Sequence, residues 1–461
     1  MKRIILSTVS FILSTLIFGQ NNQPDKLDSM FNSLATKNQF NGNVLIADKG
    51  NVIFEKSYGL ADEATKRKLN ENTIFELASV SKQFTAMGIV ILKKQGKLNY
   101  DDKISKYIPE LTFYKDISVR NLLNHTSGLP DYMDLFEKNW DKNKFATNQD
   151  IVDMFSKYKP SVKFMPSEKF EYSNTGYALL ALIIERVSKQ SFGSFLEKNI
   201  FKPLKMKNSF VYRSRYQPKK IENYALGYVT DSIGNKVLPD SFGKTYLSYY
   251  LDGIVGDGMV NSTAKDLLIW DRALYSNKLI NEGDKKEIFG YSKTNDGKEN
   301  PYGFGWALAK TEKYGIIANH TGGWAGYITF IERQLTNDKT IIMLQNNSLS
   351  STKLPIVEVR KILYNEPLPI EKALQPATLT EKDLDKYLGV YCSEKIPLKI
   401  TISKKGNTLY TQATGQQELP MDAYENDIFK FEPAGIKLIF NTKENSFELN
   451  QGNIKLVFKK E

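Results

Sequence analysis

The sequence predicts a mixed α/β domain followed by a small all-β domain, and three observations support this. Residues 20–365 contain both helix-like and strand-like segments. Residues 366–376 are rich in proline, which indicates a linker between domains. Residues 377–461 contain only short alternating segments separated by polar turns, which is typical of a small antiparallel sheet. A chain of 461 residues is long enough for about two domains with real cores.

The composition argues against several partners and cofactors. The 41% of hydrophobic and 25% of charged residues suit an ordinary globular protein. The net charge of +11 is spread along the chain without a basic tract between aromatic residues, so we expect no nucleic-acid partner. Cys392 has no second cysteine to pair with, and His125 and His320 are too few for the usual zinc sites. We therefore expect no metal and no cofactor.

The first residues predict a secretory signal peptide. Lys2 and Arg3 precede an apolar run at 4–18, which ends at the small residue Gly19. A basic head, a short apolar stretch and a small residue are typical of a leader that is removed, here 1–19. No later run is long enough to span a bilayer, so we expect an exported mature chain without a transmembrane segment, either periplasmic or secreted.

The first elements of the main domain are a helix and a hairpin. Residues 24–37 place apolar side chains on one side of a helix. Residues 43–48 and 51–56 predict two strands, with Lys49 and Gly50 as the turn between them.

The next predicted helix is a buried one, which begins near Ser79 and stops at Gly96. Its apolar residues fall on one face at helical spacing: Phe84, Met87, Ile91 and Leu92. Ser79 and Lys82 are three positions apart, so one helical turn brings the hydroxyl and the amine to the same side. A hydroxyl beside a lysine that can lose its proton is one way to build an activated nucleophile. Ser-x-x-Lys occurs elsewhere in this chain, so the motif alone is a weak signal.

The middle of the chain contains a short helix, a polar motif and a glycine-rich loop. Residues 117–132 predict a short helix that ends in a turn with glycine and proline. A Tyr-Ser-Asn motif, from Tyr172 to Asn174, stands directly before a strongly apolar helix at 177–187. A glycine-rich loop at 253–258 precedes another helix.

The last part of the main domain predicts strands. Residues 302–306 and 316–320 are expected as short strands, and 327–334 with 340–345 as a hairpin. A helix ending near Tyr364 closes the domain. In the C-terminal domain, the expected strands of a barrel-like sheet lie at 398–402, 408–410, 428–431, 437–440 and 454–458.

Three polar clusters, far apart in the chain, need a common explanation. They are Ser79-x-x-Lys82, Tyr172-x-Asn174 and His320-Thr321-Gly322. In order and spacing they resemble the serine β-lactamase and penicillin-binding superfamily, especially its class C β-lactamase and DD-peptidase branch, which also contains esterases and D-aminopeptidases. The resemblance covers roughly residues 25–365. It implies a β-lactamase/transpeptidase-like α+β fold, with an antiparallel sheet flanked by helices.

The resemblance implies acyl transfer, with a catalytic group and an oxyanion hole. Ser79 would attack a carbonyl and form an ester with the enzyme, and Lys82 and Tyr172 would handle the protons. Which of these two is the base stays open; our hypothesis gives Lys82 the acylation step and Tyr172 the leaving-group proton and the deacylating water. The backbone N–H groups of Ser79 and Gly323 would stabilise the oxyanion.

The resemblance also implies substrate contacts. Asn174 would hold the substrate's amide carbonyl, while His320, Thr321 and Gly322 would face its carboxylate or ester end. His125 is expected either to pack as a turn beneath the site or to contact the substrate. Four aromatic residues either line the pocket or are ordinary aromatics at a sheet edge: Trp324, Tyr327, Tyr132 and Trp306.

Departures from the family pattern bear on the substrate. His320 stands where many β-lactamases and carboxypeptidases have lysine, Ser173 where class C β-lactamases usually have alanine, and Lys205 where glycine is usual. These differences favour a peptidase or esterase, acting on a small-molecule or peptide substrate of which cell-wall fragments are one source. The alternatives are a true class C-type β-lactamase and a non-catalytic module that binds peptidoglycan or peptides.

Overall fold

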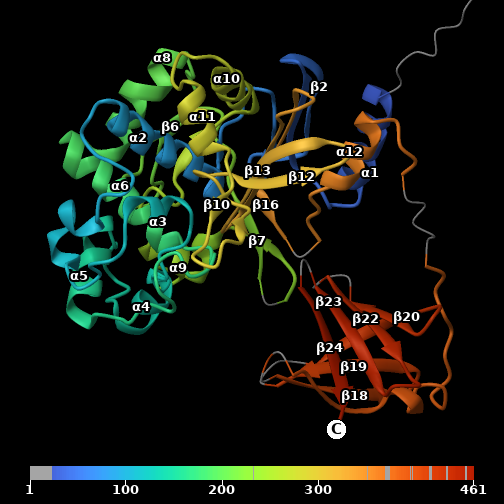
Figure 1. Cartoon of the computed structure of the whole chain (residues 1–461). Helices are drawn as coiled ribbons and strands as arrows, with labels where there is room; N and C mark the ends of the chain where they lie inside the picture. The colour runs from blue at the N-terminus through green and yellow to red at the C-terminus, as the bar shows by residue number, and fades with distance from the viewer. Residues whose placement is uncertain are drawn as a thin grey trace, which may run out of the picture.

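The computed structural model describes residues 23–461 apart from 232, 350, 369–373, 395, 397, 415–417, 432–434 and 452–453. The signal peptide predicted at 1–19 lies outside the described residues. Figure 1 shows two bodies, a mixed helix and sheet domain and a C-terminal barrel, joined by the chain after α12 (Ile356–Leu363). Among the described residues, no helix is both long and apolar enough to cross a membrane.

A six-stranded sheet forms the centre of the main domain, in the order β12-β13-β14-β15-β1-β2. Its strands are β1 (Gly42–Asp48), β2 (Asn51–Tyr58), β12 (Ala307–Thr311), β13 (Gly315–Trp324), β14 (Tyr327–Gln334) and β15 (Lys339–Gln345). All its pairings are antiparallel, and β1 pairs with both β2 and β15. The sheet therefore joins the N-terminal hairpin to the end of the domain, and the predicted antiparallel α+β fold is confirmed.

The strand predicted at 302–306 is wrong, because the chain there turns and the strand begins only at Ala307. Gly305 has a φ of 79°, a conformation that glycine adopts easily. A Cβ atom at Gly305 would lie 2.8 Å from the carbonyl oxygen of Lys82. The segment is thus shaped by its close approach to the Ser79 region rather than by strand pairing.

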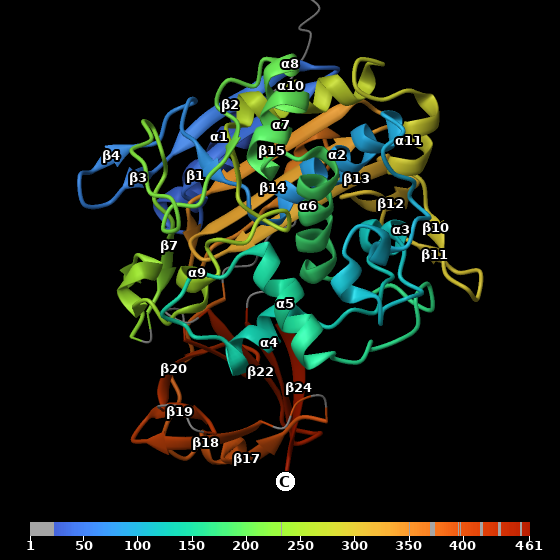
Figure 2. The same cartoon turned by 90° about the vertical axis from the view of Figure 1, so that its left-hand side faces the viewer.

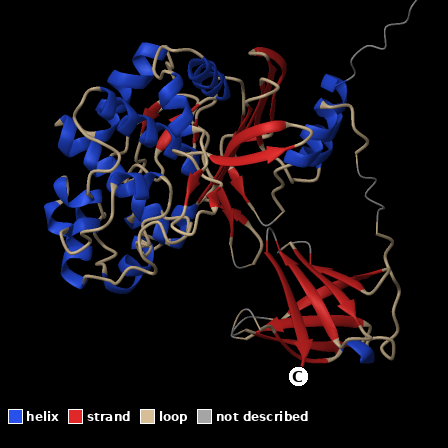
Figure 3. Ribbon diagram, in the orientation of Figure 1, coloured by secondary structure: helices blue, strands red, loops and turns tan. Residues whose placement is uncertain are grey.

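Helices cover both faces of the sheet, as the blue ribbons on either side of the red strands show (Figure 3). On one face lie α1 (Gln23–Thr36) and α12, which bury Leu27, Phe31 and Ile362 in a common core. The larger core on the other face is built from the remaining helices of the domain. These are α2 (Lys82–Lys94), α3 (Val119–Leu123), α4 (Tyr132–Asn139), α5 (Asn148–Tyr158), α6 (Asn174–Ser188), α7 (Phe192–Leu196), α8 (Lys202–Leu204), α9 (Leu247–Tyr250), α10 (Ala264–Tyr275) and α11 (Glu282–Ile288).

Helix α2 runs through the middle of this core, beside α6 (Figure 2). Every residue from Lys82 to Leu92 is buried, which confirms the predicted buried helix and extends its burial beyond the one apolar face, because a helix enclosed on all sides buries all its faces. Gly88 permits the close packing, because a Cβ atom there would lie 2.6 Å from the Cδ1 of Ile184 in α6. A 3-10 turn, η1 (Ala78–Ser81), precedes α2 and carries Ser79.

Short strands hold the segments around η1 in place. β5 (Phe75–Glu76) pairs with β9 (Val260–Ser262), which also pairs with β6 (Phe210–Val211). These pairings place the glycine-rich loop at 253–258 against the start of α2. Other short strands pair at the edges of the domain: β3 (Leu60–Asp62) with β4 (Arg67–Lys68), β7 (Tyr228–Thr230) with β8 (Lys236–Val237) and β16 (Asn347–Ser348), and β10 (Ser292–Lys293) with β11 (Glu299–Asn300).

The C-terminal strands close into a barrel, which confirms the predicted all-β domain. They are β17 (Gly389–Cys392), β18 (Lys399–Lys405), β19 (Thr408–Ala413), β20 (Leu419–Tyr424), β21 (Ile428–Phe431), β22 (Ile436–Asn441), β23 (Ser446–Gln451) and β24 (Ile454–Lys460). Pairing of Tyr391 with Lys460 closes the ring between β17 and β24. Aromatic side chains such as Phe440 and Phe447, with centroids 5.1 Å apart, fill its interior.

A buried ion pair ties α10 to the sheet and predicts a large loss of stability when one partner is removed. Arg333 Nε donates to Asp271 Oδ1 at 2.5 Å, and Thr340 Oγ1 donates to Asp271 Oδ2 at 2.9 Å. Both charged side chains are almost fully buried. Asp271→Ala should lower the free energy of unfolding by about 3–5 kcal/mol, because it leaves an uncompensated buried charge.

The matched control is Asp101→Ala, which breaks the solvent-exposed pair with Arg120. It should cost about 1 kcal/mol or less. Denaturant unfolding followed by circular dichroism measures both variants, and equal losses would contradict this role of Asp271.

Candidate active site

Ser79 lies in a tight turn between β5 and α2. The residue before it, Ala78, has a φ of 48°, in the left-handed region that residues with a Cβ rarely adopt. Ser79 is half-buried and lines a cavity of about 220 Å³. The turn thus presents a serine hydroxyl to a small enclosed space.

The amine of Lys82 is fully buried and makes three hydrogen bonds. Its Nζ lies 3.0 Å from Ser79 Oγ, 3.0 Å from Asn174 Oδ1 and 2.8 Å from the backbone oxygen of Asp257. A charged ammonium has three hydrogens, which matches these three oxygens. A neutral amine has two hydrogens and one lone pair. Because the two carbonyl oxygens can only accept, the lone pair of a neutral Lys82 would face the Ser79 hydroxyl.

The structure places the ring of Tyr172, rather than its hydroxyl, against this amine. Lys82 Nζ lies 4.9 Å from the ring centroid, and the Tyr172 side chain is 40% exposed. In the described part of the chain, the Tyr172 hydroxyl makes no hydrogen bond to Ser79 or Lys82. The alcohol and the amine therefore meet directly, while the phenol of this exposed residue does not join their hydrogen bond.

His125 supports Tyr172 from beneath. Its ring is fully buried and lies 4.3 Å from the Tyr172 ring, centroid to centroid. Nδ1 accepts a hydrogen bond from the backbone N–H of Ser173 at 3.0 Å. Burial, followed by the charge of Lys82, lowers the pKa of His125 well below its usual value. Of the two expectations for this residue, the geometry favours the packing role, since the buried ring is not presented to a ligand.

Both ring nitrogens of His320 have hydrogen-bond partners within the protein, so the ring offers no free nitrogen for the expected contact with the substrate. Its Nδ1 lies 2.6 Å from the backbone oxygen of Thr321 and must donate to it, so Nε2 accepts from the Tyr302 hydroxyl at 2.8 Å. Burial, with the charge of Lys82 as a second cause, lowers the pKa of His320 to about 3. The ring is neutral and fully engaged inside the protein, whereas Thr321, next to it, is exposed.

The strand β13 brings Gly322 and Gly323 beside the Ser79 turn. A Cβ atom at Gly322 would overlap the carbonyl oxygen of Leu77 and the Oγ1 of Thr329. Thr329 Oγ1 donates to Leu77 O at 2.6 Å and so joins the sheet to this turn. Gly323 lines the same cavity as Ser79, as an oxyanion hole formed by their backbone N–H groups would require.

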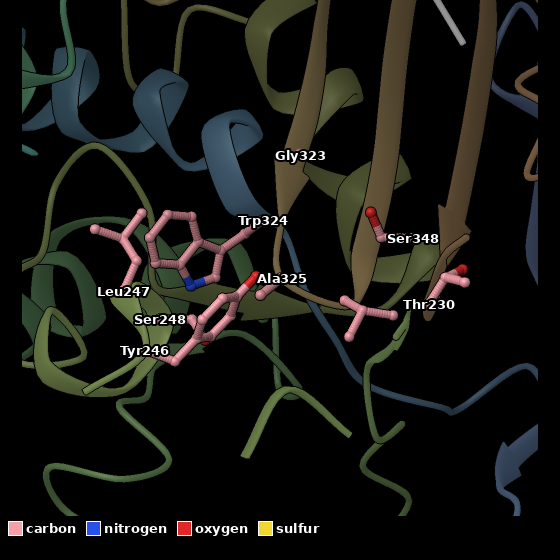
Figure 4. A pocket seen from close by; sticks show the side chains of 9 residues that line it. Thr230, Tyr246, Leu247, Ser248, Gly323, Trp324, Ala325 and Ser348 are labelled. Carbon is pink, nitrogen blue, oxygen red and sulfur yellow. The ribbon is translucent and has the colours of Figure 1, made fainter. Parts of the chain in front are cut away.

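A second cavity, of about 460 Å³, adjoins the first and shares Gly323 and Trp324 with it. Figure 4 shows its wall, in which the Trp324 indole lies beside Tyr246 and Ser248. Of the four aromatic residues considered from the sequence, Trp324 and Tyr132 line these cavities. The other two are buried in the domain: Tyr327 and Trp306.

Two site residues were missed from the sequence, Asp257 and Glu76, and both line the smaller cavity. Asp257 belongs to the glycine-rich loop, where Gly256, with a φ of 103°, allows the chain to pack against α6. Its backbone oxygen accepts from Lys82, and its carboxylate accepts from the Tyr132 hydroxyl at 2.9 Å. The glycine cluster was the signal for a special loop, but nothing in the sequence shows that the loop contacts Lys82.

Comparison with known proteins identifies the family of this chain. The family model described as "Beta-lactamase" matches residues 27–357. The chain is 38% identical to penicillin-binding protein 4* of Bacillus subtilis (strain 168), over 93% of this chain and 96% of that protein. This chain belongs to the β-lactamase family. It is a serine hydrolase of the superfamily that includes the β-lactamases and penicillin-binding proteins.

Solved structures agree with the fold. An octameric penicillin-binding protein homologue from Pyrococcus abyssi has a TM-score of 0.64 at 22% identity, covering 94% of this chain and 99% of that chain. A D-amino acid amidase from Ochrobactrum anthropi SV3, in complex with L-phenylalanine amide, has a TM-score of 0.60 at 25% identity, covering 75% of this chain and 98% of that chain. The first of these likenesses, which extends over nearly the whole chain, bears on the fold alone.

The two lowered histidine pKa values predict that neither ring titrates near neutral pH. The ordinary histidine pKa is 6.5, and the folded protein holds both His125 and His320 neutral well below it. As the pH falls, the histidines of the unfolded chain take up protons at a higher pH than those of the folded protein. The contribution of the two neutral rings to stability is therefore complete above pH 6.5, and it is lost as the pH falls toward their pKa values in the folded protein. Ring resonances of both residues should therefore stay fixed between about pH 5 and 8 in an NMR titration. A midpoint near the ordinary value for either ring would contradict the buried geometry.

Gly322→Ala is predicted to destabilise the contact between β13 and the Ser79 turn. The added Cβ has no room beside Leu77 O and Thr329, so strand and turn must separate. Overpacking of this kind costs about 1–3 kcal/mol, measurable as a lowered melting temperature. Gly323→Ala is the matched control for stability, because a Cβ there meets no atom within 4 Å. Equal melting temperatures for the two variants would refute the steric argument.

Proposed function

We propose that this protein is an exported serine hydrolase that works through an acyl-enzyme on an amide or ester of a D-amino acid or D-peptide. The observation that carries the proposal is the 3.0 Å contact between Lys82 Nζ and Ser79 Oγ inside a cavity that can hold a small acyl group. Membership of the family supports the hydrolase chemistry, and the amidase likeness supports substrates built from amino acids.

Acylation begins when a neutral Lys82 takes the proton of Ser79 as Oγ attacks the substrate carbonyl. The carbonyl oxygen becomes an oxyanion, which accepts hydrogen bonds from the backbone N–H groups of Ser79 and Gly323. Each such donor is worth on the order of 3 kcal/mol of barrier in a dry site. Asn174 holds the substrate's amide carbonyl, since its side chain is fixed by Lys82 at the cavity wall.

Tyr172 serves the leaving group and the second half of the reaction. Its exposed hydroxyl gives a proton to the departing amine or alcohol, and the bond between the carbonyl carbon and the leaving group breaks. Water then adds its hydroxide to the acyl carbon and returns its proton to Tyr172. The ester bond to Ser79 breaks, and Lys82 gives the stored proton back to the serine oxygen. Thr321, exposed beside the buried His320, contacts the leaving-group end of the substrate together with Gly322.

Two alternatives make different predictions. A true class C-type β-lactamase would hydrolyse nitrocefin with many turnovers. A non-catalytic peptidoglycan- or peptide-binding module would be labelled by neither a fluorophosphonate nor a fluorescent penicillin. The neutral, internally bonded His320 favours the hydrolase proposal over the β-lactamase, because it offers no cation to the carboxylate that β-lactams carry.

Export and domain organisation complete the proposal. The leader at 1–19 would direct the chain out of the cytoplasm, after which a hydrolase domain at 20–365, a linker at 366–376 and the barrel domain at 377–461 remain. The catalytic residues proposed here all lie in the first of these domains.

Intact-protein mass spectrometry with a panel of D-amino-acid esters and amides tests the proposal. The wild-type chain should gain the mass of the acyl group, located on Ser79 by peptide mapping, and Ser79→Ala should gain none. Tyr172→Phe should lower steady-state turnover by about a hundredfold or more, since a proton-transfer group is lost. Full turnover in Tyr172→Phe would remove that residue from the mechanism, and no adduct on Ser79 with any donor would overturn the proposed function.

A further inference from the structure

The charged side chains that line the cleft have one sign. Among the described residues that line the two adjoining cavities, the charged side chains are Glu76 and Asp257, both acidic. No lysine or arginine side chain is part of this lining in the described chain. The amine of Lys82 lies outside this lining, makes three hydrogen bonds within the protein and acts on Asp257 through its charge. The lining side chains around Glu76 therefore suit a cation better than a carboxylate.

Glu76 is a buried residue with a carboxyl oxygen that is not satisfied within the described chain. Glu76 is one of the residues that line the cavity containing Ser79, and it is only 4% exposed. Within the described chain, its buried Oε1 has no hydrogen-bond partner. Leaving such a group unpaired is costly, so a native protein that keeps one gives reason to look for a ligand.

No nearby cation forms an ion pair with Glu76 in the described chain. Arg215 contributes a positive charge, but its guanidinium pairs with Asp240 at 2.5 Å and with Asp252 at 3.3 Å. Burial, followed by the charge of Asp252, raises the pKa of Glu76 to about 8, and Asp257 adds to the rise.

The uncharged neighbours of Glu76 are also engaged elsewhere. Tyr224 donates to Asn261 at 3.1 Å, and Tyr327 donates to the backbone oxygen of Ala225 at 2.7 Å. Burial, as the first cause of the raised pKa, therefore favours the protonated form of the Glu76 carboxyl. A cation entering the cavity would favour its ionised form.

We propose that Glu76, with Asp257 beside it, forms a subsite for an ammonium group on the acyl part of the substrate. The assignment to the acyl part rests on the proposed function: Asn174, which holds the acyl amide, lines this cavity, whereas Tyr172 and Thr321 on the leaving-group side do not. Two substrate classes carry such an ammonium, those with a free α-amine and those with an amino side chain of the lysine type.

Binding to the full-length Ser79→Ala protein tests this subsite without depending on catalysis. Isothermal titration calorimetry compares three ligands: D-alanine amide, N-acetyl-D-lysine amide and the uncharged N-acetyl-D-norleucine amide. At least one of the two cations should bind about tenfold or more tightly than the norleucine amide. The stronger of the two identifies whether the α-amine or the side-chain amine is recognised.

The variant Glu76→Gln, made in the same Ser79→Ala protein, should abolish this preference while keeping the size of the side chain. Glu71→Gln is the matched control, because it removes an exposed acid from the same part of the chain and should keep the preference. Equal binding of all three ligands, absence of any binding, or a preference that survives Glu76→Gln would overturn the subsite. Cation-selective binding without an adduct on wild-type Ser79 would support the subsite and overturn only the proposed hydrolase function.

Discussion

The buried amine of Lys82 is the constraint on which the site depends. An amine, whether charged or neutral, can stay out of water only if its hydrogens find acceptors, since leaving a buried polar group unpaired costs several kcal/mol. Its three acceptors come from three segments: the η1 turn, the start of α6 and the loop at 253–258. These segments must pack tightly before the amine is satisfied, and glycines at Gly88 and Gly256 permit that packing. The packing that builds the helical core therefore also sets the positions of the reacting groups.

The sequence predicted the site best where two reacting residues are only a few positions apart in the chain. Ser79 and Lys82 are one turn apart, so their contact follows from any helix at that position. The contact of Lys82 with Asn174 was not predicted, because no local rule joins residues so distant. The orientation of His320 was not predictable, since it depends on the hydroxyl of Tyr302, which arrives from a segment wrongly expected to be a strand. Glu76 was overlooked because its burial beside a cavity is visible only in three dimensions.

The fold shows the same division between local and non-local information. The hairpin of β1 and β2 and the barrel strands have alternating patterns that reveal them directly. Three barrel strands were not predicted, at Gly389–Cys392, Leu419–Tyr424 and Ser446–Gln451, because they are short or interrupted by polar residues and proline. Helix α2 was predicted in its position and as a buried helix, but not as enclosed on every side, since complete enclosure is decided by the helices and strands around it.

The account as a whole claims that Lys82 activates Ser79, and the rate of serine labelling measures this most directly. The second-order rate constant for modification of Ser79 by an uncharged fluorophosphonate should be compared in the wild-type chain and in Lys82→Met, which keeps an unbranched side chain in the buried site. We expect a fall of about a hundredfold or more, because the serine hydroxyl loses the group that accepts its proton. Labelling at the wild-type rate in a folded Lys82→Met protein would contradict the account.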